Sequence, residues 1–447
     1  EMIGTRSPAL PDLKPQSPVR PLVPGQPSSG EFAATLPDNT PLTQPYWLRE
    51  DGAAGISRVS DPSLIGRPES PPAAPIEYTF AINGQQLTIA DEPVQLIAGA
   101  SEAQARKPMA VIPPVVLALN SEVFIVAPGA TKQVTVEISA ARGNQAGSLQ
   151  LEAPAGWKIA PSAQPFHLNA VGDKASVTFS ITSPATASSG WLKASANVGG
   201  HQYSNQRYEV RYAHIPVQLL QPPARARVAS FELATKGLNI GYLPGAGDYV
   251  AECLTQMGYL VRPLTGADLT PEKLKGLDVV VIGVRAFNER DDLKTALPAL
   301  FAWVEQGGTV IAQYNRPNGL QATELGPYKL SIEGPAPKLR VTDEKAPVSF
   351  ISPDQRVLNA PNKIGAGDFD GWVQERGAYF PSSWDEAHYE TVLSMSDPGE
   401  APLTSSILIA KHGQGYYIYT GVAFFRQLPA GVPGAYRLFA NLVSLGK

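Results

Sequence analysis

The spacing of hydrophobic and polar residues changes near residue 235. Before that point apolar residues alternate with polar ones, as in KQVTVEISA, where Val134, Val136 and Ile138 are separated by polar side chains. Such alternation places one face of a strand in a core and the other in solvent. The runs VFIVAPG, GSLQLEAPAGWKIAP, KASVTFSIT and GWLKASANVGG are separated by turn residues, so residues 108–216 are predicted to form a β-sandwich.

Residues 31–107 carry shorter runs of the same style. In IEYTFAINGQQLTIA the pair Asn83-Gly84 separates two alternating segments, which is a strong hairpin signal. We expect a β-rich, Ig-like unit over this segment, and an incomplete one if strands precede Glu1.

From residue 236 strands alternate with helices, which indicates a mostly parallel sheet. Val250, Cys253, Leu254 and Met257 fall at i, i+3, i+4 and i+7 and form one apolar helical stripe. The segment 279–282 is apolar throughout, as expected for a strand buried on both faces. The other expected elements are strands at 238–242, 259–264, 309–314, 407–410 and 415–420 and helices at 297–306 and 436–445.

The chain is therefore predicted to be multidomain, with N-terminal β-sandwich (Ig-like) modules followed by an α/β domain. The expected divisions are a Pro-rich arm or linker (1–30), the Ig-like unit (31–107), the β-sandwich (108–216), a connector (217–235) and the α/β domain (236–447). Prolines three or four residues apart in the arm suit a polyproline-II or disordered strap, or a ligand for a partner domain.

Composition narrows the range of partners. A net charge of −4 over 447 residues gives no basic face, so nucleic acid is a poor partner. No apolar run approaches the ~20 residues of a membrane helix. The single cysteine, Cys253, excludes an intrachain disulfide and a cysteine-based zinc site.

No cofactor motif is complete. Gly245-Ala246-Gly247 resembles half of a dinucleotide fingerprint, but the third small position is Val250, so we expect a tight turn with Asp248 capping the next helix. There is no G-x-S-x-G elbow. The five histidines are isolated, so we expect no catalytic metal and no cofactor, with His388 in DEAH as the weak exception.

Two groups of residues are the candidate ligand-binding site. Arg285, Asn288, Asn315 and Arg316 follow buried strands, whose carboxyl ends form the crevice of open α/β sheets. The other group lies in one loop and joins charges with rings; its members are Asp368, Trp372, Glu375 and Arg376. We expect both groups around one crevice, where rings and carboxylates suit a sugar or acyl-sugar and Asp368 with Glu375 could transfer protons. The competing interpretation is a structural loop held by arginine–carboxylate pairs over buried rings.

These segments carry a family resemblance over roughly residues 35–447. GYLPGAGDYVAECLTQMGY, VIGVRAFNERDDL, GGTVIAQYN, RVTDEKAPV, APNKIGAGDFDGWVQERGAYFPSSWD and YTGVAFFRQLPAGVPGAYRLFANLVSLG resemble the C-terminal region of large bacterial PIG-L (LmbE-like) deacetylases. The segments TQPYWLRE and AHIPVQLLQPP match the same architecture. The resemblance implies β-sandwich modules, a domain similar to class I glutamine amidotransferases, a periplasmic or extracellular setting and a link to acylated sugars.

Neither family activity transfers onto these residues. The A-H-P-D-D-E-like zinc motif is missing, and the one cysteine is not at an elbow. The expectation is a non-catalytic accessory region, fragment or partner of a sugar deacetylase that recognises carbohydrate and scaffolds domains. Two alternatives stay open: an α/β enzyme that uses Arg285, Asp368 and Glu375 on a sugar derivative, and a structural protein that self-associates through its Ig-like modules and Pro-rich arm.

Overall fold

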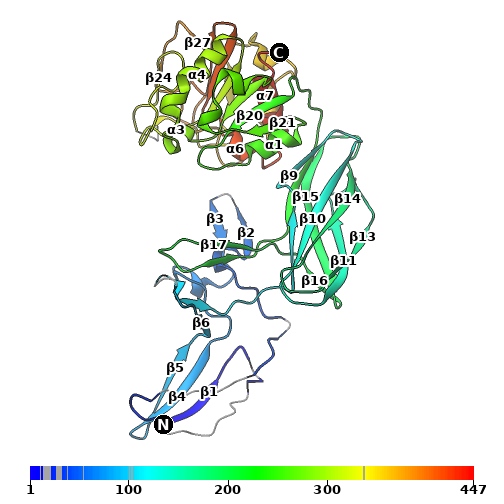
Figure 1. Ribbon diagram of the computed structural model, residues 1–447, viewed down its shortest axis with the longest axis vertical. Coiled ribbons are helices and arrows are strands. Elements are labelled where there is room, and N and C mark those ends of the chain that lie inside the picture. The colour runs from blue at the N-terminus through cyan, green and yellow to red at the C-terminus, as the bar shows by residue number, and fades with distance from the viewer. Residues whose placement is uncertain are drawn as a thin grey trace.

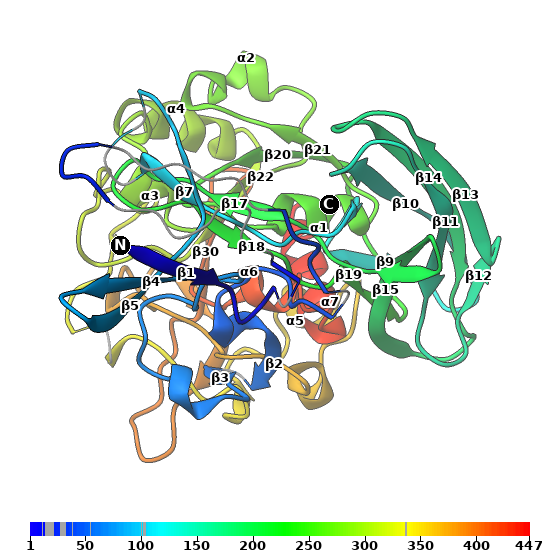
Figure 2. The same ribbon diagram turned by 90° about the horizontal axis from the view of Figure 1, so that it is seen from below.

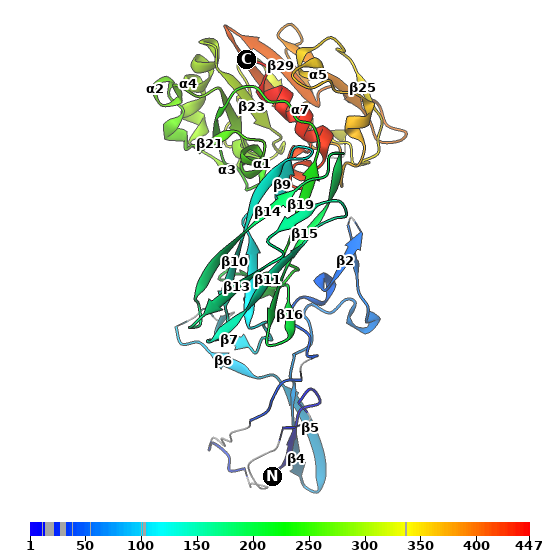
Figure 3. The same cartoon turned by 90° about the vertical axis from the view of Figure 1, so that its right-hand side faces the viewer.

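The computed structural model describes residues 1–10, 12–13, 22–26, 33–37, 39–53, 55–99, 101, 104–335 and 338–447. Much of the expected Pro-rich arm lies outside these residues, and only Pro8 and Pro24 of its prolines fall within them. The chain is elongated, with small N-terminal sheets at one end, a β-sandwich in the middle and an α/β domain at the other end (Figures 1 and 3).

The N-terminal part contains three small sheets. One has the order β1-β4-β5 and stands apart from the sandwich (Figures 1 and 2), and the other two are the ribbons β2-β3 and β6-β7. Their bounds are β1 Met2–Arg6, β2 Glu50–Ala53, β3 Ile56–Arg58, β4 Ile76–Ile82, β5 Gln85–Asp91, β6 Val94–Leu96 and β7 Arg106–Pro108. The predicted hairpin is confirmed, since β4 pairs with β5 and Asn83 and Gly84 both have positive φ.

The Ig-like unit expected over residues 31–107 is therefore corrected. None of the buried apolar clusters of the described chain contains a residue of this segment. A sandwich needs two facing sheets that bury a shared apolar layer. The described ribbons have no such shared layer, so the segment is β-rich without being a sandwich.

The sandwich has two sheets, one with the order β12-β14-β10-β8 and one with the order β13-β11-β15-β19-β9, in which β16 also pairs with β15. The alternation predicted in β10 holds, because Val134, Val136 and Ile138 are fully buried. The strands are β8 Val115–Leu119, β9 Val123–Val126, β10 Thr131–Ala140, β11 Gln145–Glu152, β12 Lys158–Ala160, β13 Ala163–Leu168, β14 Lys174–Thr182, β15 Ser188–Val198, β16 His201–Tyr203 and β19 Arg225–Ser230.

The connector expected over 217–235 is also corrected. Strand β19 lies inside that range, pairs antiparallel with β15 and parallel with β9, and buries Ala226 and Val228 in the sandwich core. The strand before it, β18 Gln218–Leu220, forms a separate ribbon with β17 Tyr208–Val210. The prolines of this stretch precede β19, so they do not interrupt its ladder.

The C-terminal domain is built on a seven-stranded sheet with the order β21-β20-β22-β23-β30-β29-β27. The first five strands run parallel, β29 runs in the opposite direction, and β27, which pairs antiparallel with β29, runs in the direction of the first five. In this order they are β21 Leu260–Pro263, β20 Asn239–Leu243, β22 Val279–Ile282, β23 Thr309–Gln313, β30 Gly415–Thr420, β29 Ile407–His412 and β27 Tyr389–Thr391. The mostly parallel sheet expected for this region is present.

Helices cover both faces of this sheet (Figure 3). Val279 and Val281 pack with α1 and α7, while Val280 and Ile282 pack with α4, so β22 is buried on both sides as predicted. The helices are α1 Val250–Gln256, α2 Pro271–Leu274, α3 Ala286–Glu289, α4 Leu293–Glu305, α5 Arg356–Asn359, α6 Phe424–Gln427 and α7 Pro433–Val443. The long segment between β23 and β29 carries the pairs β24 Leu330–Ser331 with β26 Ser383–Trp384 and β25 Val348–Phe350 with β28 Leu393–Met395.

One end of the sandwich rests on α1. The Glu252 carboxylate accepts hydrogen bonds from the Ser121 hydroxyl and from the Glu122 amide at 2.9 Å. Lys132 donates to the Gln256 side chain at 2.6 Å, and burial lowers its pKa to about 8. Burial, and to a lesser extent the Glu252 charge, raise the pKa of Glu122.

The Glu122 carboxyl makes the stability of this junction depend on pH. Its folded pKa lies above the unfolded value, so the folded state binds more protons and stability falls as pH rises through the folded pKa. Glu122→Gln should therefore raise the melting temperature at pH 7 and have almost no effect well below the unfolded pKa, at about pH 3. Circular dichroism melts between pH 3 and pH 7 measure the difference in melting temperature between Glu122→Gln and the wild type. Glu152→Gln, at an exposed carboxylate of the same sandwich, is the control. A difference in melting temperature between Glu122→Gln and the wild type that is constant with pH contradicts the assignment.

Candidate functional site

The carboxyl ends of β22 and β23 bring three predicted site residues together. Arg285 follows β22, and its amide donates to the Tyr314 carbonyl at 2.8 Å. The Asn315 Oδ1 accepts from the Phe287 amide at 3.0 Å. The Asn288 Oδ1 accepts from the Arg316 amide at 2.8 Å. Both asparagines are buried, so their amides hold the two loops together and are not free for a ligand.

Arg285 sits on a strained turn. Its φ is 59° and its ψ is 20°, in the left-handed region, between strand β22 and helix α3. A strand-to-helix turn of this kind presents the nucleophile in α/β hydrolases. Here the side chain is a guanidinium, which always carries its charge and is not a nucleophile. It forms an ion pair with Glu289, while its buried Nε has no hydrogen-bond acceptor in the described chain.

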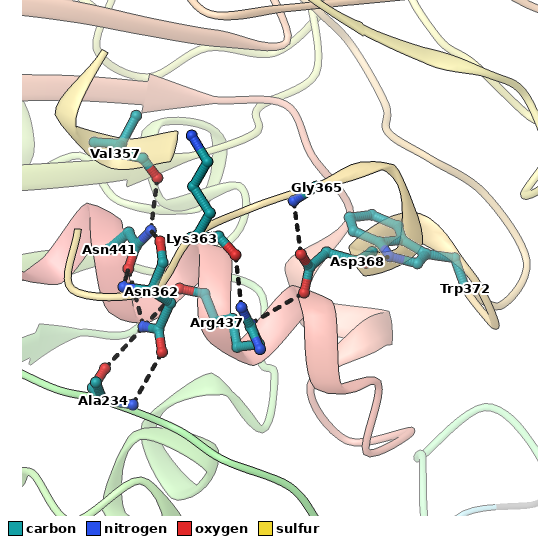
Figure 4. A network of polar contacts seen from close by, with 9 residues as sticks. All are labelled: Ala234, Val357, Asn362, Lys363, Gly365, Asp368, Trp372, Arg437 and Asn441. Carbon is teal, nitrogen blue, oxygen red and sulfur yellow. Dashed lines mark hydrogen bonds and ion pairs between the residues drawn. The ribbon is translucent and has the colours of Figure 1, made fainter. Parts of the chain in front are cut away.

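Asp368 and Trp372, two of the loop residues, serve the fold (Figure 4). Asp368 Oδ2 accepts from the Gly365 amide at 2.8 Å, and Oδ1 lies 3.1 Å from Arg437 Nε on α7. The Trp372 indole donates to the Asp368 carbonyl at 2.9 Å, and its ring is only 5% exposed. Beside them Asn362 joins α7 to Ala234, in the segment that follows β19 (Figure 4).

Arg376 is also committed to the fold. It is buried and donates to the Ala346 carbonyl at 2.9 and 3.0 Å and to the Phe369 carbonyl at 2.6 Å. Its guanidinium carbon lies 5.3 Å from the centre of the Trp372 ring. Burial lowers the pKa of Arg376, and nearby carboxylates, Asp343 first, oppose this lowering. The competing interpretation expected arginine–carboxylate pairs over buried rings. Arg376 lies over buried rings but donates to carbonyls, and the arginine–carboxylate pair beside it joins Arg437 to Asp368.

Glu375 belongs to a different neighbourhood. Its Oε1 accepts from Arg426 Nε at 2.7 Å, and Arg426 also donates to the Gln374 side chain at 2.6 Å. Arg426 lies over the ring of Phe425, 4.8 Å from its centre. Arg426 is in α6, which follows β30, so this group joins the same edge of the sheet as Arg285.

Tyr314 is the centre of this edge. Its ring lies 5.1 Å from that of Phe425 and 5.8 Å from that of Tyr379, at an interplanar angle of 24° to the latter. Burial raises the pKa of Tyr314; the charges of Arg285, Arg426 and Arg316 lower it, in that order, and Glu375 raises it. We call Tyr314, Tyr379, Phe425 and these charged neighbours the Tyr314 cluster.

Backbone strain is concentrated at this cluster. Five non-glycine residues of the described chain have positive φ, and three of them are Arg285, Gln374 and Tyr379, at 59°, 67° and 53°. The other two are asparagines in turns, where this conformation is common. Such strain costs about 1–3 kcal/mol per residue and collects at functional sites. The strain therefore marks the Tyr314 cluster as the candidate site.

No sequence pattern predicted Tyr314, Tyr379, Phe425 or Arg426 as site residues. Strand β30 forms a hairpin with β29 and also pairs parallel with β23, from Thr309↔Tyr416 to Gln313↔Thr420. Residues that follow a parallel strand reach the carboxyl edge. The aromatic-basic run FFR, which three residues separate from the end of β30, was the available signal.

The remaining chemical candidates do not form a second site. The turn at Gly245 packs against the β22–α3 turn, where a Cβ on Gly245 would lie 2.1 Å from the Val284 carbonyl oxygen, so glycine serves this close backbone approach. Cys253 is buried, and burial raises its pKa to about 12. His388 Nδ1 lies 2.8 Å from Asp385 Oδ2. In the part of the chain that the structure describes, no three His, Cys, Asp or Glu side chains could hold a metal ion.

No helix in the described ranges is long and apolar enough to cross a membrane.

Trp372→Ala tests the structural role of the loop. Removing this buried ring should lower the free energy of unfolding of the α/β domain by about 3–5 kcal/mol. Val373→Ala, at the exposed neighbouring position, should change it by less than about 0.5 kcal/mol. Denaturant unfolding followed by circular dichroism gives both values. Equal stability of the two variants would show that the Trp372 ring does not support the fold.

Comparison with known proteins gives only weak structural likeness. No protein-family model matches the chain, and no curated protein matches it. Native alpha-2-macroglobulin from Escherichia coli, spanning domain MG7 to the C-terminus, is similar with a TM-score of 0.19 and 16% identity over 29% of this chain and 19% of that one. A cryo-EM reconstruction of the native conformation of E. coli alpha-2-macroglobulin gives a TM-score of 0.19 and 12% identity over 38% of this chain and 9% of that one. This chain spans a fifth or less of either protein, and likeness at these TM-scores carries no argument about fold or function.

Proposed function

We propose that this chain is a non-catalytic ligand-binding and scaffolding region whose α/β domain binds a sugar derivative at the Tyr314 cluster. The observation that carries the proposal is the strained backbone of Arg285, Gln374 and Tyr379 around one partly exposed ring. Aromatic rings beside fixed polar groups suit a sugar, which has apolar faces and a rim of hydroxyls.

A binding role has more support than a catalytic one. The strand-to-helix turn after β22 carries Arg285, and a guanidinium group cannot attack a substrate as a nucleophile. Asp368 and Glu375, the candidates for proton transfer, are each paired with an arginine, Arg437 and Arg426 respectively. These ion pairs hold both carboxylates against the protein, so neither is free to reach a proton of a substrate.

The biological setting rests on the resemblance to the C-terminal region of PIG-L (LmbE-like) deacetylases, including its amidotransferase-like domain. On that basis the chain works outside the cytoplasm, in the periplasm or beyond, beside a deacetylase domain that acts on acylated sugars. The sandwich supports this arrangement as a spacer, because its strand ends contact α1 through Ser121 and Lys132.

Removing the Tyr314 ring tests the binding proposal. Isothermal calorimetry with a panel of neutral, N-acetylated and acidic mono- and oligosaccharides should detect at least one ligand of the wild-type chain. Tyr314→Ala should abolish that binding, and Tyr314→Phe, which keeps the ring but loses the hydroxyl, should weaken it without abolishing it. Melting temperatures show whether each variant is folded. A panel without any binding sugar, or equal binding by folded Tyr314→Ala, contradicts the proposal.

Self-association is a second candidate function, favoured by the sheet β1-β4-β5. Ile82, Leu87 and Ile89 are 56%, 48% and 48% exposed. The register pairs Phe80 with Leu87 and Tyr78 with Ile89, so these residues share one face. An apolar face on a small sheet is a common site of association, and two copies could bury it symmetrically.

A charge on this face should prevent such pairing. Size-exclusion chromatography with light scattering should give a concentration-dependent dimer for the wild type and a monomer for Leu87→Asp. Thr88→Asp places the same charge on the opposite face of β5 and should leave the dimer intact. A wild-type chain that stays monomeric at high concentration rules out this second function.

A further inference from the structure

One buried hydrogen-bond donor of the Tyr314 cluster, Arg285 Nε, has no acceptor within the described chain. Arg316, two residues after Tyr314, is exposed, and its charge acts on the Tyr314 hydroxyl. A buried charged donor without an acceptor is costly, because it loses its hydrogen bonds to water without replacing them. Such a donor at a strained site points to a ligand that supplies an acceptor.

The charge of the cluster is positive. Three guanidinium groups, those of Arg285, Arg316 and Arg426, act electrostatically on the Tyr314 hydroxyl. Two carboxylates oppose them, Glu289 paired with Arg285 and Glu375 paired with Arg426. One positive charge therefore remains. It belongs to Arg316, which has no ion pair in the described chain.

The backbone already holds these groups in position. The left-handed turn at Arg285 and the hydrogen bond from its amide to the Tyr314 carbonyl fix the backbone from which the Arg285 side chain extends. Arg316 exchanges two backbone bonds with the Asn288 side chain, at 2.8 and 3.1 Å. Because these contacts form in the free protein, less ordering is needed when a ligand binds.

We propose that the Tyr314 cluster selects acidic sugar derivatives, and that Arg285, Arg316 and the Tyr314 hydroxyl bind the carboxylate or phosphate group. This inference rests on the proposed sugar-binding function and specifies its ligand class. An anion satisfies several guanidinium donors at once, with hydrogen bonds about twice as strong as those of a neutral hydroxyl. The rings of Tyr314 and Phe425 then lie beside the sugar body.

Calorimetry with four soluble probes tests the ligand class. D-glucuronate and glucose 6-phosphate carry the two anionic groups, N-acetylglucosamine is neutral, and inorganic phosphate carries an anion without a sugar. At least one acidic sugar should bind at least about tenfold more tightly than N-acetylglucosamine, and this binding should weaken with added salt. Arg316→Gln should reduce acidic-sugar affinity by about tenfold. Arg340→Gln, at another exposed arginine of the same domain, should leave it unchanged.

The outcomes separate this inference from the proposed function. N-acetylglucosamine that binds as tightly as the acidic sugars, with no effect of Arg316→Gln, overturns the anion selectivity and leaves sugar binding intact. Inorganic phosphate that binds as tightly as glucose 6-phosphate overturns the sugar selectivity. No binding of any probe overturns both proposals. Preference for glucuronate or for glucose 6-phosphate supports the inference and identifies the anionic group.

Discussion

The parallel pairing of β23 with β30 is the interaction on which the candidate site depends. The two strands are about a hundred residues apart in the chain, and their pairing covers five positions, from Thr309↔Tyr416 to Gln313↔Thr420. It brings the residues after each strand to one edge, so Tyr314 meets Phe425 and Arg426 there. Without this ladder the aromatic and basic residues of the cluster would belong to unrelated loops.

Polar residues near that edge differ in whether the fold has already used them. Asn288 and Asn315 are buried and bonded to backbone groups, as a buried polar group must be to avoid a large desolvation cost. The fold also uses Arg376, which is buried and donates to the Ala346 and Phe369 carbonyls. Arg285 and Arg316 differ from these residues, since Arg285 Nε has no acceptor in the described chain and Arg316 is exposed. Charge and amide content alone do not separate these two kinds of residue.

The rest of the molecule positions this domain. The sandwich contacts α1 at two places: the Glu122 amide donates to the Glu252 carboxylate of α1, and the Lys132 ammonium group donates to the Gln256 side chain of α1. The Lys132 ammonium group is partly removed from water. A junction made of a few hydrogen bonds is smaller and more polar than a domain core. The small sheets at the other end of the chain have no core of their own among the described residues, and this leaves an apolar face on β5.

Local sequence patterns determined much of this protein. The alternation in β10, the Asn83-Gly84 turn and the wholly apolar β22 each state a periodicity or a backbone preference that a strand or turn satisfies by itself. The placement of Arg285 after β22 followed from the same reasoning. The predicted Ig-like unit and the connector failed because strand segments do not reveal which partners they will find. Only the tertiary structure placed β30 beside β23 and β19 inside the sandwich. It also decided that Trp372 is a core residue, because burial and hydrogen-bond partners come from segments far apart in the chain.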